Sequence, residues 1–227
     1  MPMLTKNVIP FLTELASNNN KLWFDKNRTW YQAASKDFKD FIEELIPQLV
    51  ATDPKLAGIS AKDCVYRIFR DVRFSNDKTP YKISMAANVA PGGKSSKLAS
   101  FYIHVEPTGK SIAGGGIYMT DPPFLKAMRN EFFQVPEELL DIFNQPEFKK
   151  YFNGLWEEDK LKTAPKGFPK DFEHIDLLKH KHDIVLTELT KADITGVELL
   201  PKLVAIHRAM YPLNRLINTI FEDAGLV

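Results

Sequence analysis

The residue types best suited to chemistry are concentrated in one run, residues 67–82. It holds five cationic side chains and two carboxylates within sixteen residues. Three of the cations are arginines at a spacing of three, Arg67, Arg70 and Arg73. Because each guanidinium is a rigid two-pronged donor, the run predicts recognition of a phosphate, a carboxylate or a neighbouring Asp.

This run is expected to form a strand, a turn and a second strand. If residues 64–74 are one strand, Arg70 shares its face with apolar side chains. A guanidinium there needs a carboxylate, carbonyl groups or a bound anion, because an unpaired buried charge is costly. The turn adds main-chain N–H groups, hydroxyls and an ammonium. The expected ligand-binding residues are Arg67, Arg70, Asp71, Arg73, Ser75, Asp77, Lys78, Tyr81 and Lys82.

Two interpretations of this motif stay open. In the first, it binds a small anionic ligand, phosphate-bearing ligands included; Tyr81 and Asp77 are the nearest acid or base candidates, and no catalytic residue is assigned. In the second, an internal Arg–Asp network locks the strand to neighbouring helices, and the protein is a non-enzymatic interaction or scaffold domain. Nucleic-acid binding is disfavoured, since a formal net charge of +1 gives no long-range attraction to polyanions.

The glycine-rich segments predict no cofactor. Gly93, Lys94 and Ser95 imitate the end of a phosphate-binding loop, but Asn88 stands where that motif needs a glycine. A hairpin loop followed by a strand also lacks the helix N-terminus that binds the phosphates. The glycines at 114–116 lack dinucleotide-binding spacing and indicate a bulge or a close backbone contact.

Histidine and cysteine add no further site. His180 and His182 stand among lysines, which is typical of a solvated surface, and no carboxylate spacing completes a metal site. His104 and His207 are expected to be exposed. Cys64 is the only cysteine in the sequence and is expected in the core.

Composition favours an ordinary globular domain. The 227 residues are 44% hydrophobic and 26% charged, which is typical of a protein with a sizeable core. We find no repeat or linker, so residues 1–227 are expected to form one domain. No secretion signal or apolar span is visible, which predicts a cytoplasmic protein with no membrane contact. The oligomeric state is not determined by the sequence.

The apolar spacing predicts helices first and then strands. Residues 30–49 repeat apolar side chains at three and four, with Pro47 expected to bend or end this helix. From about 64 to 118 the period is two, which predicts an antiparallel meander. Residues 184–189 are the candidate for one more strand.

Helices return in the second half of the chain. They are expected to begin at Pro122, near Pro136 and near Pro146, and to close the chain over 197–210 and 213–221. The fold class is therefore α+β, with a central antiparallel meander packed by N-terminal and C-terminal helices.

The motif also resembles a known family. The pattern R-x-x-R-D-x-R-F-x-x-x-K-x-P-Y, which runs from Arg67 to Tyr81, is similar to the signature of the domain-of-unknown-function family numbered 2461, bacterial proteins of about this length. The stretches around residues 11–24 and 161–167 also resemble recurrent stretches of that family. The resemblance implies no reaction, cofactor or catalytic residue.

Overall fold

The computed structural model describes residues 4, 6–73 and 76–227. These residues form ten α-helices, one 3₁₀ helix and a four-stranded antiparallel sheet, so the α+β class is confirmed. The chain divides into two compact units, each described separately below. The first comprises Met1–Ser95, Tyr102–Ala113 and Glu188–Ala205, and the second Ser96–Phe101, Gly114–Thr187 and Ile206–Val227. The expectation of one domain stays a prediction.

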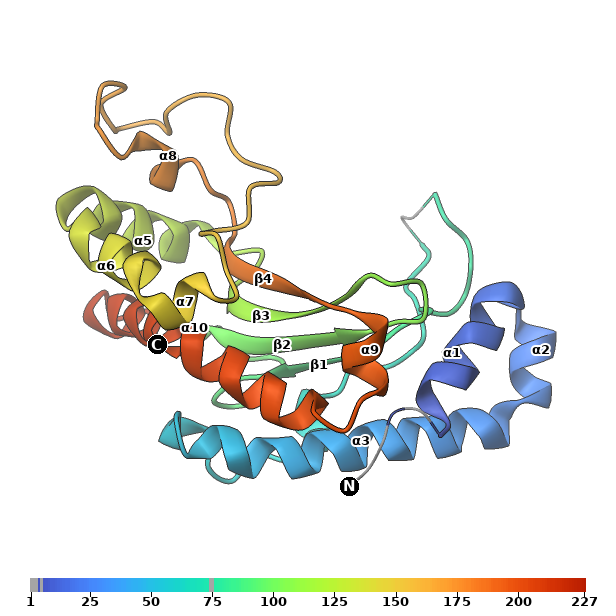
Figure 1. Ribbon diagram of the computed structural model, residues 1–227. Helices are drawn as coiled ribbons and strands as arrows, with labels where there is room; N and C mark the ends of the chain where they lie inside the picture. The colour runs from blue at the N-terminus through green and yellow to red at the C-terminus, as the bar shows by residue number, and fades with distance from the viewer. Residues whose placement is uncertain (1–3, 5, 74–75) are drawn as a thin grey trace. The chain divides into compact units, whose positions relative to one another are not determined.

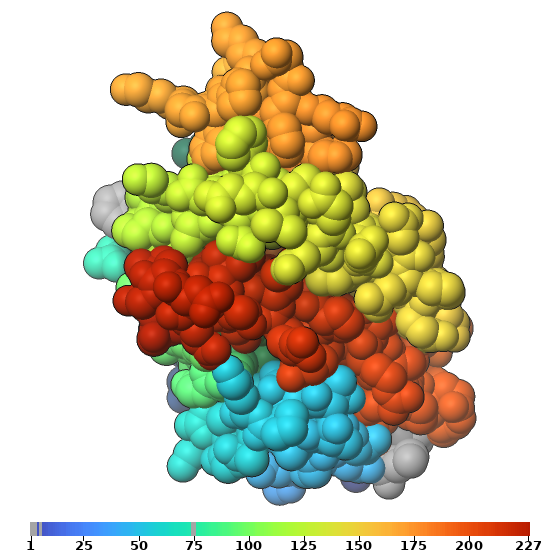
Figure 2. Space-filling view, turned by 90° about the vertical axis from the view of Figure 1, so that its left-hand side faces the viewer, coloured from blue at the N-terminus to red at the C-terminus, as the bar shows by residue number. Residues whose placement is uncertain are grey.

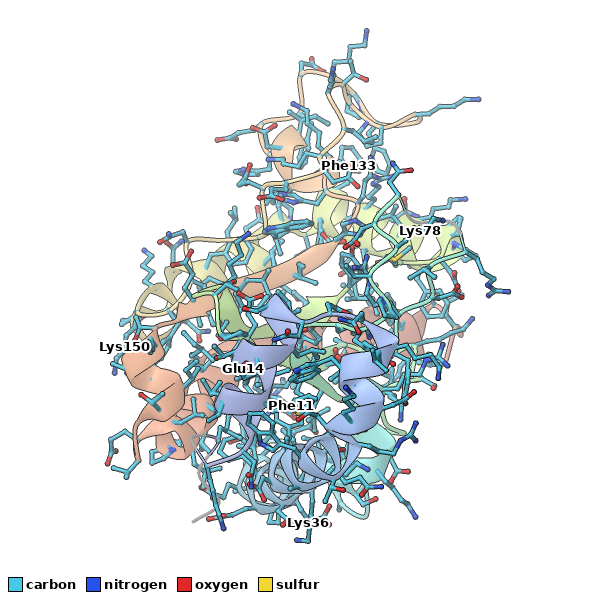
Figure 3. The ribbon with its side chains drawn as sticks, turned by 90° about the vertical axis from the view of Figure 1, so that its right-hand side faces the viewer. Phe11, Glu14, Lys36, Lys78, Phe133 and Lys150 are labelled. Carbon is cyan, nitrogen blue, oxygen red and sulfur yellow. The ribbon has the colours of Figure 1, made fainter. Side chains whose placement is uncertain are left out.

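Three helices at the N-terminus build the core of the first unit (Figure 1). They are α1 (Val8–Ser17), α2 (Lys21–Lys26) and α3 (Arg28–Val50). Phe11 on α1 is fully buried, and its ring lies 5.9 Å from Trp23 and 6.2 Å from Phe24 on α2. Figure 3 shows Phe11 between these helices, whereas Lys36 projects from the outer side of α3. The apolar stripe on each helix therefore decides how the three pack.

Helix α3 is longer than the sequence predicts. Its buried side chains follow the expected spacing, and the helix continues through Pro47 to Val50. The prediction that Pro47 could end the helix is therefore wrong. The buried Leu45, Ile46 and Leu49 flank the proline, so packing on both sides compensates for the one missing hydrogen bond.

Short helical segments complete the first unit. They are η1 (Pro54–Leu56), α4 (Ala61–Cys64) and α9 (Lys191–Thr195). The N-terminus of α4 is capped by Asp63, whose carboxylate accepts from the Ser60 N–H at 3.1 Å and from its hydroxyl at 2.7 Å. Glu43 of α3 accepts from the Ala61 N–H at 2.7 Å. These bonds make residues 61–64 helical, so the strand expected to begin at Cys64 does not begin there.

The sheet has the strand order β1-β2-β3-β4. The strands are β1 (Met85–Val89), β2 (Ser100–Val105), β3 (Ser111–Ile117) and β4 (Asp183–Leu189). The predicted meander and its extra strand near 184–189 are confirmed. On β2 the buried Phe101, Ile103 and Val105 alternate with half-buried residues, as expected for a strand with one face on a core.

Residues 65–73 do not form the regular strand that their alternation predicts. They make two isolated antiparallel bridges, Val65 with Ala87 and Phe69 with Tyr81. On either side of the second bridge, main-chain bonds join Arg70 N–H to Pro80 C=O at 3.0 Å and Lys82 N–H to Ile68 C=O at 2.8 Å. The segment is thus an irregular hairpin, because Pro80 supplies no N–H to the ladder.

The second unit holds the helices of the middle of the chain. They are α5 (Pro122–Gln134), α6 (Pro136–Asn144), α7 (Pro146–Lys149) and α8 (Ile175–Leu178). The first three begin at the prolines that the sequence marks, which suits a residue without an N–H at the first helical position. Figure 2 shows the orange segment that includes α8 next to the yellow-green α5.

The C-terminal helix α10 (Leu199–Asp223) is one helix rather than the two predicted. The expectation of a break at residues 211–212 is wrong. Buried side chains recur at three and four on both sides of Pro212, with Ile206 and Met210 before it and Leu213 and Ile217 after it. The continuous apolar stripe holds the helix together across the proline. No helix among the described residues combines the length and apolar character that crossing a membrane requires.

Candidate functional site

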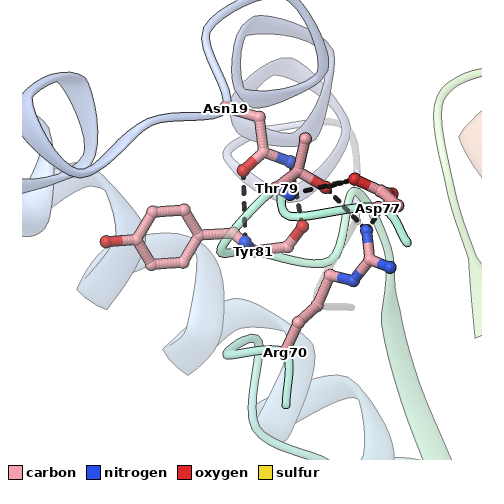
Figure 4. Close-up of polar contacts among 5 residues, drawn as sticks. All are labelled: Asn19, Arg70, Asp77, Thr79 and Tyr81. Atoms are coloured by element: carbon pink, nitrogen blue, oxygen red, sulfur yellow. Dashed lines mark hydrogen bonds and ion pairs between the residues drawn. The ribbon is translucent and has the colours of Figure 1, made fainter. Parts of the chain in front are cut away.

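Arg70, Asp77 and Thr79 form one hydrogen-bonded group in the first unit (Figure 4). The Arg70 guanidinium donates to the Asp77 carboxylate and, at 2.6 Å, to the Thr79 hydroxyl. Asp77 in turn accepts from the Thr79 N–H at 2.9 Å and from its hydroxyl at 2.8 Å. The Arg70 hydrogen bond, followed by those from Thr79, lowers the pKa of Asp77 to about 2. The carboxylate therefore ties Arg70 to Thr79.

Asn19 joins the same turn to the N-terminal helices. Its side chain donates to the Tyr81 carbonyl at 2.9 Å and accepts from the Tyr81 N–H at 3.1 Å, which imitates a strand partner (Figure 4). The Tyr81 ring stacks on Phe24 of α2 with centroids 3.9 Å apart and planes 10° apart. Tyr81 is 5% exposed, so its side chain is packed in the core and its main chain is bonded to Asn19.

The remaining turn residues mostly contact one another. Arg73 binds Asp71 with two donors, Nε at 2.9 Å and Nη2 at 2.7 Å, and both side chains are exposed. The Lys78 ammonium donates to the Val72 carbonyl at 3.0 Å. Figure 3 labels Lys78 on this loop. Ser75, the other residue expected at the site, lies outside the described residues.

Arg67 and Lys82 differ from the rest of the motif. Among the described residues, neither side chain makes a hydrogen bond or an ion pair. Lys82 is half-buried, and its ammonium lies 5.4 Å from the centre of the Tyr66 ring. Burial lowers the pKa of Lys82, and the positive charges of Arg67 and Arg70 lower it further. We refer to Arg67 and Lys82 as the cationic pair.

Polar side chains of β2 lie near Lys82. The Tyr102 hydroxyl and His104 Nδ1 are 3.2 Å apart, and His104 Nε2 lies 3.9 Å from a Glu106 carboxylate oxygen. Burial lowers the pKa of His104; Glu106 acts in the opposite direction, and the charge of Lys82 adds a smaller lowering. A neutral imidazole near the Lys82 ammonium can donate or accept a hydrogen bond at neutral pH.

The sequence predicts the face of the strand on which Tyr102 and His104 lie, but not the burial of His104. Their alternation with Phe101 and Ile103 places them opposite the core, as expected. The expectation that His104 is exposed is wrong, because its side chain is only 24% exposed. Its proximity to Lys82 depends on the irregular pairing of residues 65–73 with 79–87, whereas the sequence predicts a regular strand, a turn and a second strand.

Lys94 is already bound to main-chain oxygens. Its ammonium donates to the carbonyls of Lys62 at 3.1 Å and Asp63 at 3.2 Å. It therefore binds the C-terminal end of α4. The buried Cys64 thiol has a pKa raised by burial to about 11, which confirms its prediction as a core residue.

Two histidines of the second unit are placed differently from their prediction as surface residues. His180 is 4% exposed, and its Nδ1 lies 3.0 Å from the Trp156 carbonyl. The ring of His182 lies 4.5 Å from that of Tyr118. The described residues contain no group of three or more His, Cys, Asp or Glu arranged to hold a metal ion. His207, also expected to be exposed, is 1% exposed on α10.

Comparison with protein families gives one match. The family model described as "Conserved hypothetical protein (DUF2461)" matches residues 7–215. The chain belongs to this family. The match covers most of both compact units, and it confirms the resemblance seen in the sequence. No curated protein and no solved structure matched the chain.

Proposed function

We propose that this member of the family binds a small anionic ligand, phosphate-bearing ligands included, through Arg67 and Lys82. The observation that carries the proposal is a half-buried lysine beside an arginine, neither of them within ion-pair distance of a carboxylate in the described part of the chain. Asp71 interacts with Arg67 only at longer range. Lys82 is partly desolvated and lies close enough to Arg67 for the two positive charges to repel each other, and a bound anion would reduce that repulsion.

The two cations suit different parts of such a ligand. Arg67 is exposed and offers a planar fork that matches two oxygens of a phosphate or carboxylate. Lys82 offers a point charge whose position is favoured by the Tyr66 ring beneath it. His104 and Tyr102 add a hydrogen-bonding pair beside Lys82.

The other motif residues support the alternative in part. Arg70 with Asp77 and Thr79, and Asn19 with Tyr81, are bonded within the fold, as expected of a structural network. If the cationic pair binds nothing, the whole motif is structural, and an interaction or scaffold domain is the better description. The proposed site is accordingly narrower than the nine residues expected from the sequence.

Calorimetry and thermal shift would test the proposal. The probes are inorganic phosphate, a nucleoside monophosphate and a dicarboxylate, each added to the wild type, Lys82→Met, Arg67→Gln and the control Lys39→Met on the exposed side of α3. A probe at 100 times its dissociation constant stabilises a protein by about 2.7 kcal/mol. We expect that stabilisation in the wild type and the control, and its loss in the other two variants.

The same experiment can reject the proposal. If no probe stabilises the wild type, or if Lys82→Met and Arg67→Gln respond as the wild type does, the cationic pair is not an anion site. Lys82→Met is expected to melt no lower than the wild type, since it removes a partly desolvated charge. A marked loss of its stability would instead favour the structural alternative.

A further inference from the structure

The second unit contains a cavity that the motif does not explain. Its volume is about 560 Å³, within the range of roughly 300–1,000 Å³ for small-molecule sites. It is lined by Thr120, one side of α5 and residues 166–168 of the following loop. Figure 3 labels Phe133, which α5 contributes to the lining, and Figure 2 shows the loop region in orange above α5.

The polar lining of the cavity is cationic. Lys126, Arg129 and Lys166 line it, and none of its described lining residues is Asp or Glu. Arg129 is fixed, because its Nε and Nη2 donate to the carbonyls of Leu178 at 2.8 Å and His180 at 3.1 Å. Lys126 and Lys166 are exposed and make no ion pair with any described residue. The lining therefore offers two exposed cations beside one that is held in place by hydrogen bonds.

The positive charge of Arg129 is only weakly neutralised by the nearby Asp183 carboxyl. Asp183 is fully buried and interacts with Arg129, but burial raises its pKa to about 7. Burial therefore favours the uncharged carboxyl, so Asp183 competes less with an external anion for the guanidinium than an ordinary carboxylate would.

The rest of the lining suits an apolar planar body. Phe133 and Phe168 both line the cavity, with ring centroids 5.5 Å apart and planes at 71°. Phe133 is also 4.9 Å from Phe172, which holds its ring in position. The Thr120 hydroxyl oxygen is buried and lacks a hydrogen-bond partner in the described part of the chain. A buried hydroxyl of this kind is usually satisfied by a water molecule or a ligand.

We propose that this cavity is a binding site for a small aromatic molecule that carries one anionic group. Arg129, Lys126 and Lys166 attract the anionic group, the two phenylalanines contact the ring, and Thr120 hydrogen-bonds a polar substituent. The site is made of other residues than the cationic pair and does not depend on the function proposed above.

Titration calorimetry with four probes tests this site. Indole-3-acetate and phenyl phosphate combine a ring with an anion, inorganic phosphate lacks the ring, and benzyl alcohol lacks the charge. We expect the two aromatic anions to bind the wild type at least tenfold more tightly than the other probes. Each of Lys126→Met and Lys166→Met is expected to weaken them by about tenfold, which corresponds to about 1.4 kcal/mol.

Two control variants make the outcome specific. Lys170→Met removes an exposed lysine from the same loop that does not line the cavity, and it should bind the aromatic anions as the wild type does. Lys82→Met should also leave this binding unchanged, whatever it does to phosphate binding. The proposal is overturned if no aromatic anion binds, if benzyl alcohol binds equally well, or if Lys82→Met abolishes binding while Lys166→Met does not.

Discussion

The Arg70 guanidinium donates a hydrogen bond to the carboxylate of Asp77, seven residues later in the chain. The Thr79 hydroxyl accepts a hydrogen bond from Arg70 and donates one to Asp77. We predict that Asp77→Asn lowers the melting temperature at neutral pH, because the depressed pKa of Asp77 shows that the folded state favours the carboxylate. This contribution is present above about pH 4 and is lost as the pH falls through about 2. Thermal melts from pH 7 downward would measure it.

A matched control is Asp71→Asn, which removes the exposed partner of Arg73. We expect a smaller change, since exposed pairs contribute little. Equal melting of Asp77→Asn and the wild type at neutral pH would contradict a structural role for Asp77. A double-mutant cycle with Arg70→Gln would show whether the two residues act together.

Asn19 is predicted to stabilise the hairpin through the main chain of Tyr81. Asn19→Ala removes two hydrogen bonds at once and is expected to cost about 1–3 kcal/mol of unfolding free energy. Urea denaturation would measure the loss. Asn18→Ala is the control, because among the described residues the Asn18 side chain bonds only to the Glu14 carbonyl, four residues earlier in the same part of the chain. Similar losses in the two variants would argue against a special role for Asn19.

His207 is predicted to make the protein sensitive to mild acid. Burial lowers its pKa to about 4, from 6.5, and its Nδ1 has no hydrogen-bond partner among the described residues. As the pH falls from about 6.5 to 4, His207 binds a proton in the unfolded chain but stays neutral in the folded chain. The free energy of unfolding therefore falls by up to about 3 kcal/mol.

The comparison of wild type with His207→Leu isolates this effect. Leucine fills a similar volume beside Phe101, whose ring lies 5.2 Å from the imidazole. Urea denaturation at about pH 7 and about pH 4.5 should show a smaller loss of stability in the variant than in the wild type. The same loss in both proteins would mean that His207 is protonated in the folded state.

Gly115 is predicted to be intolerant of any side chain. A Cβ there would lie 2.0 Å from the Ser100 carbonyl oxygen and 2.3 Å from Met210 Cε. We expect Gly115→Ala to cost more than about 2 kcal/mol by denaturation, since backbone cannot move aside as a flexible side chain does. Gly58 has a φ of +84° and open space around it. Gly58→Ala should therefore cost only the backbone strain of an alanine at positive φ, about 1 kcal/mol of unfolding free energy.

The parts of the fold that could be predicted are those with a strong period. The stripe on α3, the alternation on β2 and the prolines that begin α5, α6 and α7 are local signals that packing reinforces. The glycines at 114–116 were also interpreted correctly, because close strand contact excludes a Cβ. Pro47 and Pro212 were misleading, since buried contacts on both sides of each proline outweigh one lost bond.

The sequence predicts which residues belong to the candidate site but not which of them bond to one another. The motif identifies where cations gather, yet only the hairpin geometry shows that Arg70 meets Asp77 while Arg67 and Lys82 remain unpaired in the described part of the chain. Asn19 is 62 residues from Tyr81, and no spacing rule connects them. Such contacts depend on tertiary packing, which short-range patterns do not encode.

The burial of Cys64 has a practical consequence for work on both proposed sites. It is the only cysteine in the sequence, it is fully buried, and its raised pKa leaves almost no thiolate to react with maleimides at neutral pH. A fluorophore directed at the introduced cysteine of Lys170→Cys, which does not line the cavity, would therefore label that position alone. Ligand entry into the cavity could then be followed optically in a protein that is otherwise wild type.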